Sequence, residues 1–300
     1  MRIFISALIV SFLFSCTKPR DVQLPEHDPQ LVLHGYVAVG DTFKIALGKT
    51  LQTPALAEEE ETYVKNGWAA LYNNGLFADS LIYDDQEKRY IARMTKAVAG
   101  NTYTVSAGAP GFESVEATVV TPLPVTTVSL TRTKGARRTA GGLLLDDIKF
   151  TINDPGTERN FYLSSLHSSG RRSLTCVYTY DPVIEQASAT VAPFEQGNCI
   201  DNDALQYNDN TFNGSIRQII ISADSEALDS FPLTNGTVYR PYLKRYHVTE
   251  DYYRYFRSAY DQGLVLEEGP TFLQPRMIRG NVKNGYGLFT VFSVVTDTIR

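Results

Sequence analysis

Short apolar runs separated by turn signals fill most of the chain from Gln30 onward, and this pattern constrains the fold more than any other feature. The runs are rich in Val, Tyr, Phe and Thr, which favour β-strands. Segments 68–72 and 76–83 flank Asn74-Gly75, a dipeptide that accepts positive φ angles and therefore predicts a hairpin. About seven such runs between residues 30 and 122 predict an N-terminal β-sandwich.

A proline-containing linker divides the chain into two β-rich parts. Alternate prolines stiffen Thr121-Pro122-Leu123-Pro124, so we place the boundary between the first domain (30–122) and the second (123–300) here. Strand-like runs continue in the second part. Its basic, glycine-containing segment 132–142 predicts an exposed hairpin loop, with an anion site as the alternative. The expected fold class is mainly β, a β-sandwich followed by a second β-rich domain with one short helix.

The expected helix begins after Thr249, a residue type that caps helix N-termini, and ends at Gly263. Glu250 and Asp251 lie in its first turn, where acidic side chains suit the positive end of the helix dipole. An aromatic stripe with helical spacing predicts a face packed on a sheet, with a sugar- or ring-binding platform as the alternative. The stripe consists of Tyr252, Tyr255, Phe256, Ala259 and Tyr260.

The amino terminus has the features of an export signal. One basic residue, Arg2, precedes an apolar run over 3–14, about 12 residues long and too short to cross a bilayer core of about 30 Å. Leu13-Phe14-Ser15-Cys16 resembles the lipobox of bacterial lipoproteins. Residues 1–15 are therefore expected to be a signal peptide, Cys16 the lipidated residue, and 16–29 a polar tether. The alternative is an ordinary secreted protein that loses Cys16 or carries it incidentally.

Composition and charge exclude two classes of protein. The formal net charge is −5 and the pI about 5.5, whereas a dedicated nucleic-acid binder normally carries a basic stripe and a high pI. Charged residues make up 20% and aromatic residues 11% of the chain, which excludes a mainly disordered protein. We expect no nucleic-acid partner.

Three cysteines divide into one plus two. If Cys16 carries lipid, Cys176 and Cys199 remain as an even pair in an exported chain, which favours a disulfide. Two buried free thiols, or a metal pair without further ligands, are the alternatives.

Motifs of known chemistry are missing from the sequence. The histidines His27, His34, His167 and His247 show no metal-ligand spacing, and neither H-E-x-x-H nor G-x-S-x-G occurs. The segment 209–214 resembles a calcium loop only faintly, because its twelfth position is Ile220 instead of a glutamate, so a turn is the better interpretation. We expect no cofactor, no metal site and no enzymatic activity.

Several longer stretches resemble a family of Bacteroidota outer-membrane lipoproteins that carry a domain of unknown function and are often encoded near TonB-dependent receptors. They are LVLHGYV, GNTYTVSAGAPGFESVEATVVTPLP, NDNTFNG, DYYRYFRSAYDQG and NVKNGYGLFTVFSV. The family's closing motif falls on Asn281, Asn284, Gly285, Gly287 and Phe289, where the glycines are expected to permit a tight turn. The first domain also resembles the transthyretin-like or immunoglobulin-like modules of Bacteroidota envelope proteins.

The resemblance implies export, a palmitate-type lipid anchor on Cys16 and a location at the outer membrane of the cell envelope, with the membrane face left open. It implies no catalytic residues. The expected function is a non-enzymatic binding or accessory subunit for an envelope transporter, such as a TonB-dependent receptor, or for its ligand. The alternatives are an enzyme with a site assembled from distant loops, and a structural or adhesive surface protein.

Overall fold

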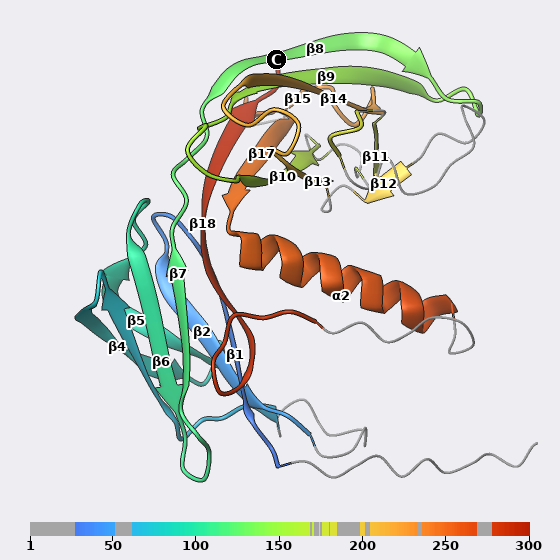
Figure 1. The fold of residues 1–300 in the computed structure, drawn as a ribbon. Helices are drawn as coiled ribbons and strands as arrows, with labels where there is room; N and C mark the ends of the chain where they lie inside the picture. Colours follow the sequence, from blue (N-terminus) through green and yellow to red (C-terminus); the bar gives the residue numbers. More distant parts are fainter. Residues whose placement is uncertain are drawn as a thin grey trace, which may run out of the picture.

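The computed structural model confirms a mainly β chain, with three sheets and a single α-helix among the residues it describes (Figure 1). It describes residues 28–51, 62–168, 170, 174, 176–179, 181–184, 199–201, 205–232, 236–268 and 278–300. Within this set, the side chains of 176, 199–201 and 260–268 are left out of the description.

The first part of the chain forms a sandwich around its own core. Asn74 and Gly75 have φ angles of 51° and 79°, as expected for the tight turn between the third and fourth strands. Inward residues such as Phe43, Tyr103 and Val105 are fully buried in this core. The strands are β1 (Leu31–Ala38), β2 (Thr42–Lys49), β3 (Trp68–Asn73), β4 (Leu76–Asp84), β5 (Arg89–Lys96), β6 (Thr102–Gly108) and β7 (Val115–Val120).

Strand β18 (Tyr286–Thr298) belongs to both parts of the fold. Up to Phe292 it pairs parallel with β1, and beyond that residue it pairs antiparallel with β17 (Tyr242–Val248). Phe289 and Val291 of β18 are buried in the core of the first sandwich. One eleven-stranded sheet therefore runs through the whole molecule in the order β13-β10-β17-β18-β1-β2-β5-β4-β3-β6-β7, and β18 is the long dark-red strand of Figure 1.

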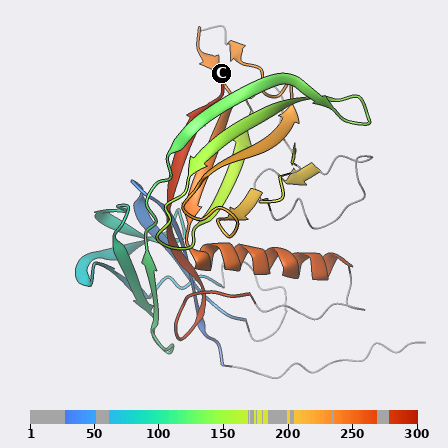
Figure 2. The same ribbon diagram turned by 45° about the horizontal axis from the view of Figure 1, so that its top comes forward.

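The second part packs a five-stranded sheet against one end of that long sheet, and Phe150 and Ile219 meet Tyr162 and Leu243 in the core between them. Figure 2 shows β8 and β9 arching over this core. The five-stranded sheet contains β8 (Thr127–Arg138), β9 (Leu144–Asn153), β11 (Cys176–Tyr178), β12 (Cys199–Asp201) and β14 (Ile216–Asp224). The remaining strands are β10 (Phe161–His167), β13 (Leu205–Asn208), β15 (Phe231–Pro232) and β16 (Val238–Tyr239).

Helix α2 (Glu250–Glu268) packs on the opposite face of β10, β17 and β18. The Thr249 hydroxyl accepts a hydrogen bond from Tyr252 N at 3.2 Å, which confirms the predicted cap. In the part of the aromatic stripe whose side chains the structure describes, the rings face the sheet, as predicted: Tyr252 contacts the rings of Tyr36 and Phe292 edge-on. The predicted stop at Gly263 is wrong, because the helix continues to Glu268.

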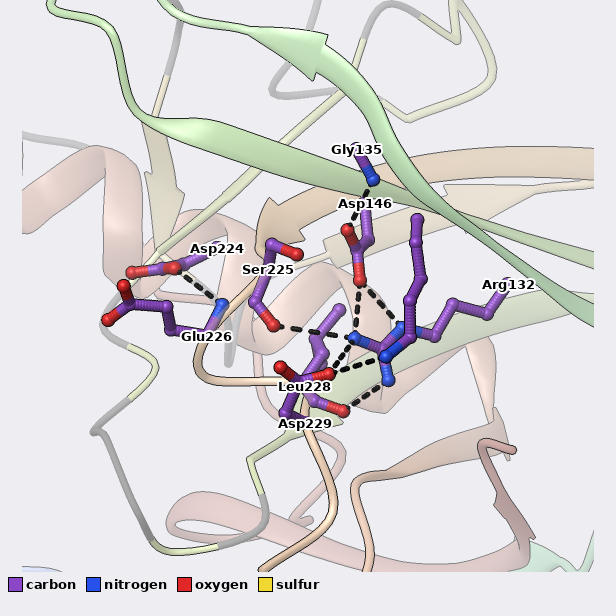
Figure 3. A network of polar contacts seen from close by, with 9 residues as sticks. Arg132, Gly135, Asp146, Asp224, Ser225, Glu226, Leu228 and Asp229 are labelled. Atoms are coloured by element: carbon purple, nitrogen blue, oxygen red, sulfur yellow. Dashed lines mark hydrogen bonds and ion pairs between the residues drawn. The ribbon is translucent and has the colours of Figure 1, made fainter.

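The prediction of an exposed loop over 132–142 is wrong for its first half, because β8 continues to Arg138. The side chain of Arg132 is only 4% exposed and its Nε donates to Asp146 Oδ2 at 2.6 Å (Figure 3). Its other nitrogens donate to the Leu228 carbonyl at 2.5 Å and to Asp229 Oδ1 at 2.9 Å. We call this network the Arg132 cluster. It connects β8 with β9 and with the turn after β14, so Arg132 has a structural role.

The other predictions about membrane and disulfide concern segments that the structure describes only in part. Cys16 lies outside the described residues. β11 and β12 pair antiparallel, with Cys176 opposite Asp201 and Cys199 opposite Tyr178, so the two cysteines lie on adjacent strands in a diagonal relation. Their bridge stays a prediction. In the described part of the chain, no helix has the length and apolar character needed to span a membrane.

Candidate functional site

A groove of about 660 Å³ lies where the two parts of the fold meet. We call it the junction groove. The first part contributes Gly100, the end of β7 and the linker, and the second part contributes the loop before β10, the end of β17 and the start of α2. Its lining residues are Gly100, 118–123, 158–161 and 247–251.

The linker that was predicted as a domain boundary forms one wall of the groove and is held by both parts of the molecule. On one side, Gly100 N donates to the Thr121 carbonyl at 3.0 Å. On the other, the hydroxyl of Ser293 in β18 donates to the Pro122 carbonyl at 2.6 Å. His247 in β17 contacts the Leu123 carbonyl. These bonds to three successive carbonyls fix the wall without any regular strand.

His247 is a buried histidine whose proton position follows from its partner. Its Nδ1 lies 2.7 Å from the Leu123 carbonyl, which can only accept, so Nδ1 carries the hydrogen and Nε2 is the acceptor in the neutral ring. Burial lowers the pKa of His247, although the hydrogen bond to the Leu123 carbonyl and the carboxylates of Glu158, Asp154 and Asp209 oppose the shift. The ring packs on Tyr162 with centroids 5.1 Å apart. At neutral pH the imidazole of His247, which lines the groove, is therefore uncharged.

A buried polar layer lies under the groove. The Tyr162 hydroxyl donates to Asp154 Oδ1, and Gly214 N donates to Asp154 Oδ2 at 2.8 Å. Burial and the neighbouring Asp154 carboxylate raise the pKa of Tyr162. Asn160 donates to Asp209 Oδ2 from its backbone N at 2.8 Å and from its Nδ2 at 3.1 Å. These bonds hold the loop before β10 against the turn at Asp209.

Three buried oxygens in or under the groove have no hydrogen-bond partner within the described residues: Thr121 Oγ1, Asn160 Oδ1 and Asp209 Oδ1. Thr121 and Asn160 line the groove and are each 1% exposed. A buried polar atom left without a partner costs about 1–3 kcal/mol, so such groups are rare in folded proteins. The floor of the groove therefore contains two oxygens that accept hydrogen bonds, those of Asn160 and Asp209, and a Thr121 hydroxyl that can accept or donate.

Charge at the groove is mainly negative. Glu158, Glu250 and Asp251 line it, against one basic residue, Arg159. The Arg159 guanidinium is already engaged, because Nη2 donates to Asn210 Oδ1 at 2.6 Å and the group lies 5.6 Å from the ring centroid of Phe161. The arrangement can accept hydrogen bonds and attract positive charge. Among the described residues, no set of three His, Cys, Asp or Glu is arranged to hold a metal ion.

The closing-motif residues lie elsewhere, at the start of β18. Asn281 bonds Phe289 in both directions, with Nδ2 donating to the carbonyl at 2.8 Å and Oδ1 accepting from N at 3.0 Å. Gly287 has a φ of +112°, and Asn284 has a φ of 58°. Gly285 and Gly287 also border a smaller pocket of about 250 Å³ beside His34 and Tyr255. These bonds and backbone angles shape the approach to β18, whose Gly287 lies opposite Leu33 of β1.

Sequence reasoning missed the residues of the junction groove. The sequence marks His247 only as a histidine without metal-ligand spacing, and Thr121 only as part of a linker. Asn160 has no distinguishing neighbours in the sequence. The one usable signal was the turn 209–214, whose Asp209 binds Asn160.

Comparison with known proteins gives a family. A family described as "Domain of unknown function (DUF4249)" matches residues 17–298. The chain belongs to the DUF4249 family. The match covers both parts of the fold, so the junction groove lies inside the family's domain.

Comparisons beyond the DUF4249 family add little. No curated protein matches the chain. A β-glycosidase from Bacteroides vulgatus shares 11% identity at a TM-score of 0.20, over 74% of this chain and 23% of that one. A biofilm-associated protein, BSP domain, shares 10% identity at a TM-score of 0.22, over 93% of this chain and 62% of that one. The chain thus spans under two thirds of both structures, and at these TM-scores neither bears on its fold or activity.

Lowering the pH from 7.5 to 5 is expected to reduce the free energy of unfolding through His247. In the unfolded chain a histidine titrates near 6.5, whereas burial lowers the pKa of His247 in the folded chain. Stability from this group is therefore fully present above about pH 6.5 and is lost as the pH falls toward the folded pKa. Urea unfolding at several pH values measures the slope, which is at most about 1.4 kcal/mol per pH unit for one group.

The matched variant is His247→Asn, whose side-chain amide can still donate to the Leu123 carbonyl but does not titrate. In this variant the free energy of unfolding is expected to depend less on pH between 7.5 and 5 than in the wild-type protein. His34, whose pKa burial also lowers, supplies part of the dependence that remains. A slope identical in the variant and the wild-type protein would contradict the assignment.

Proposed function

We propose that this protein is a non-enzymatic binding subunit of the bacterial cell envelope, anchored to the outer membrane by lipid on Cys16. The junction groove is its binding site. The observation that carries the proposal is the groove itself, which both parts of the fold build and which has buried acceptors without partners in its floor. The occupant is a ligand of an envelope transporter or a segment of such a transporter, a TonB-dependent receptor being the type that the sequence resemblance favours.

The shared strand supports a binding role. Because β18 pairs with β1 and with β17, strands β7 and β17, which end at the groove, belong to one continuous sheet, and hydrogen bonds from both parts of the fold hold the linker wall. A site whose walls are joined in this way is formed before its ligand arrives, which reduces the entropy lost on binding. Segment 16–29, with Pro19, Pro25 and Pro29, would connect the β-rich part of the chain to the membrane.

Affinity isolation of the full-length protein from native membranes in mild detergent tests the proposal. We expect at least one envelope protein to co-purify specifically with the wild-type chain. The Cys16→Ser chain should lose both membrane fractionation and palmitate labelling, because lipid chains contribute about 0.8 kcal/mol per buried methylene to anchoring. A Cys16→Ser chain that still labels with palmitate would refute the anchor, and isolation without any specific partner would refute the accessory role.

A second candidate is an enzyme, and one observation favours it. His247 presents a neutral ring whose Nε2 can accept a proton, as a general base must. Turnover of any substrate that stopped in His247→Asn while folding was retained would support this candidate over binding alone.

A further inference from the structure

We infer that the junction groove recognises a cationic amine, either a small free amine or the ammonium group of a lysine side chain. The inference rests on the proposed function, since it takes the groove to be a binding site and names what it binds. It has two independent supports, the unpaired acceptors of the floor and the excess of carboxylates around them.

The floor of the groove offers acceptors: Asn160 Oδ1 and Asp209 Oδ1 can accept a hydrogen bond, and the Thr121 hydroxyl can accept or donate one. Asn160 Nδ2 already donates to the carbonyls of Pro155 and Glu158 at 2.9 Å and 2.8 Å, and also to Asp209. These three contacts fix the orientation of the amide, because a flipped amide would place its oxygen against three acceptors. The unpaired atom of Asn160 is therefore its oxygen, which needs a donor. An ammonium group has three donors and no acceptor.

Charge favours a cation over an anion. Three carboxylates line the groove against one guanidinium, which Asn210 and the Phe161 ring already engage. His247 adds no charge at neutral pH, because burial lowers its pKa. Asp154 and Asp209 lie beneath as further negative groups whose fields reach this histidine.

The N-terminus of α2 opposes a cation, since the first turn of a helix carries partial positive charge. Thr249 caps Tyr252 N, and Glu250 and Asp251 occupy the first turn, so both effects reduce that positive potential. Glu250 pairs with Arg254 at 2.5 Å. Glu158 and Asp251, both exposed, are the two carboxylates most suited to attract the amine.

Calorimetric titration of the full-length protein in detergent tests the inference with named probes. Spermidine represents a free amine, and the peptide acetyl-Gly-Lys-Gly-amide represents a lysine side chain. The same peptide with an acetylated lysine, and maltose, are the neutral controls. We expect saturable binding of at least one amine and none of the neutral probes. Tighter binding of spermidine would indicate a free amine, and tighter binding of the lysine peptide would indicate a protein partner.

Two variants in the groove and one control variant outside it connect amine binding to the groove. Removing the two exposed carboxylates of the groove in Glu158→Gln/Asp251→Asn (the rim pair) is expected to weaken amine binding about fivefold to tenfold, as two exposed charges allow. Asp85→Asn/Glu113→Gln removes the same charge from exposed residues outside the groove and should change affinity less than twofold. Thr121→Val removes the unpaired hydroxyl; it should weaken binding about threefold or more while leaving the melting temperature unchanged or raised.

The outcomes separate this inference from the proposed function. If no amine binds, if the neutral probes bind equally, or if the control pair weakens binding as much as the rim pair, the amine assignment is overturned. Specific co-purification of an envelope protein would still support the binding role in that case. If an amine binds as expected but no envelope partner is isolated, the site assignment stands and the accessory role fails.

Discussion

Replacing Arg132 by methionine is expected to lower the free energy of unfolding by about 3–5 kcal/mol, because it leaves a buried carboxylate without its counter-charge. Asp146 is 0% exposed, and Arg132 is its charged partner. The change also removes the donors that satisfy the carbonyls of Ser225 and Leu228. Urea unfolding followed by circular dichroism, at constant pH and ionic strength, measures the loss.

Two further variants isolate the cause. Arg138→Met removes an exposed arginine of the same strand, whose Nη1 donates to the Gly142 carbonyl at 2.8 Å, and is expected to change stability by less than about 0.5 kcal/mol. Arg132→Met/Asp146→Leu removes both charges and should recover part of the loss, as apolar replacements of buried ion pairs do. A loss below about 1 kcal/mol in Arg132→Met would contradict the role of the Arg132 cluster.

Gly287→Ala is expected to destabilise the fold by more than about 3 kcal/mol and to separate β18 from β1. Gly287 has a φ of +112°, a conformation that costs an L-residue about 1–3 kcal/mol. A Cβ at this position would also overlap the carbonyl oxygen of Leu33, its partner across the parallel pair. Because that obstacle is backbone, relief requires the strands to move apart. Thermal unfolding measures the stability.

Gly40→Ala is the matched control, since Gly40 has a φ of +93° and nothing within 4 Å of the added Cβ. It isolates the conformational cost, which should be about 1–2 kcal/mol. Amide hydrogen exchange should show lost protection in β1 and in the first part of β18 only for Gly287→Ala. Equal effects of the two substitutions would mean that the close approach to Leu33 contributes nothing.

The local elements were predictable because each depends on residues close in sequence. In β1 the predicted alternation is visible in the burial, because Leu31 and Leu33 are 1% and 0% exposed whereas His34, on the other face, is half-buried. The turn at Asn74-Gly75 follows from the φ angles those residues accept, and the helix start follows from the hydroxyl of Thr249. Strand periodicity and capping act within a few residues.

The basic segment after residue 131 shows where such reasoning stops. Arg132, Lys134, Arg137 and Arg138 have the composition of an exposed loop, yet the chain continues as a strand and buries the first of them. The partners that make this burial favourable, Asp146 and Asp229, lie on β9 and after β14. No local pattern distinguishes an arginine that will meet a buried carboxylate from one that will meet water.

The sequence by itself determined where most of the strands lie, where the helix begins and that the fold is mainly β, because these depend on short-range geometry and on which side chains avoid water. Only the tertiary structure decided that β18 pairs with β1, which brings Leu33 beside Gly287, and that linker, β10 loop and β17 enclose one groove. The physical reason is that pairing and cavity formation depend on contacts between residues more than a hundred positions apart, such as Leu123 with His247.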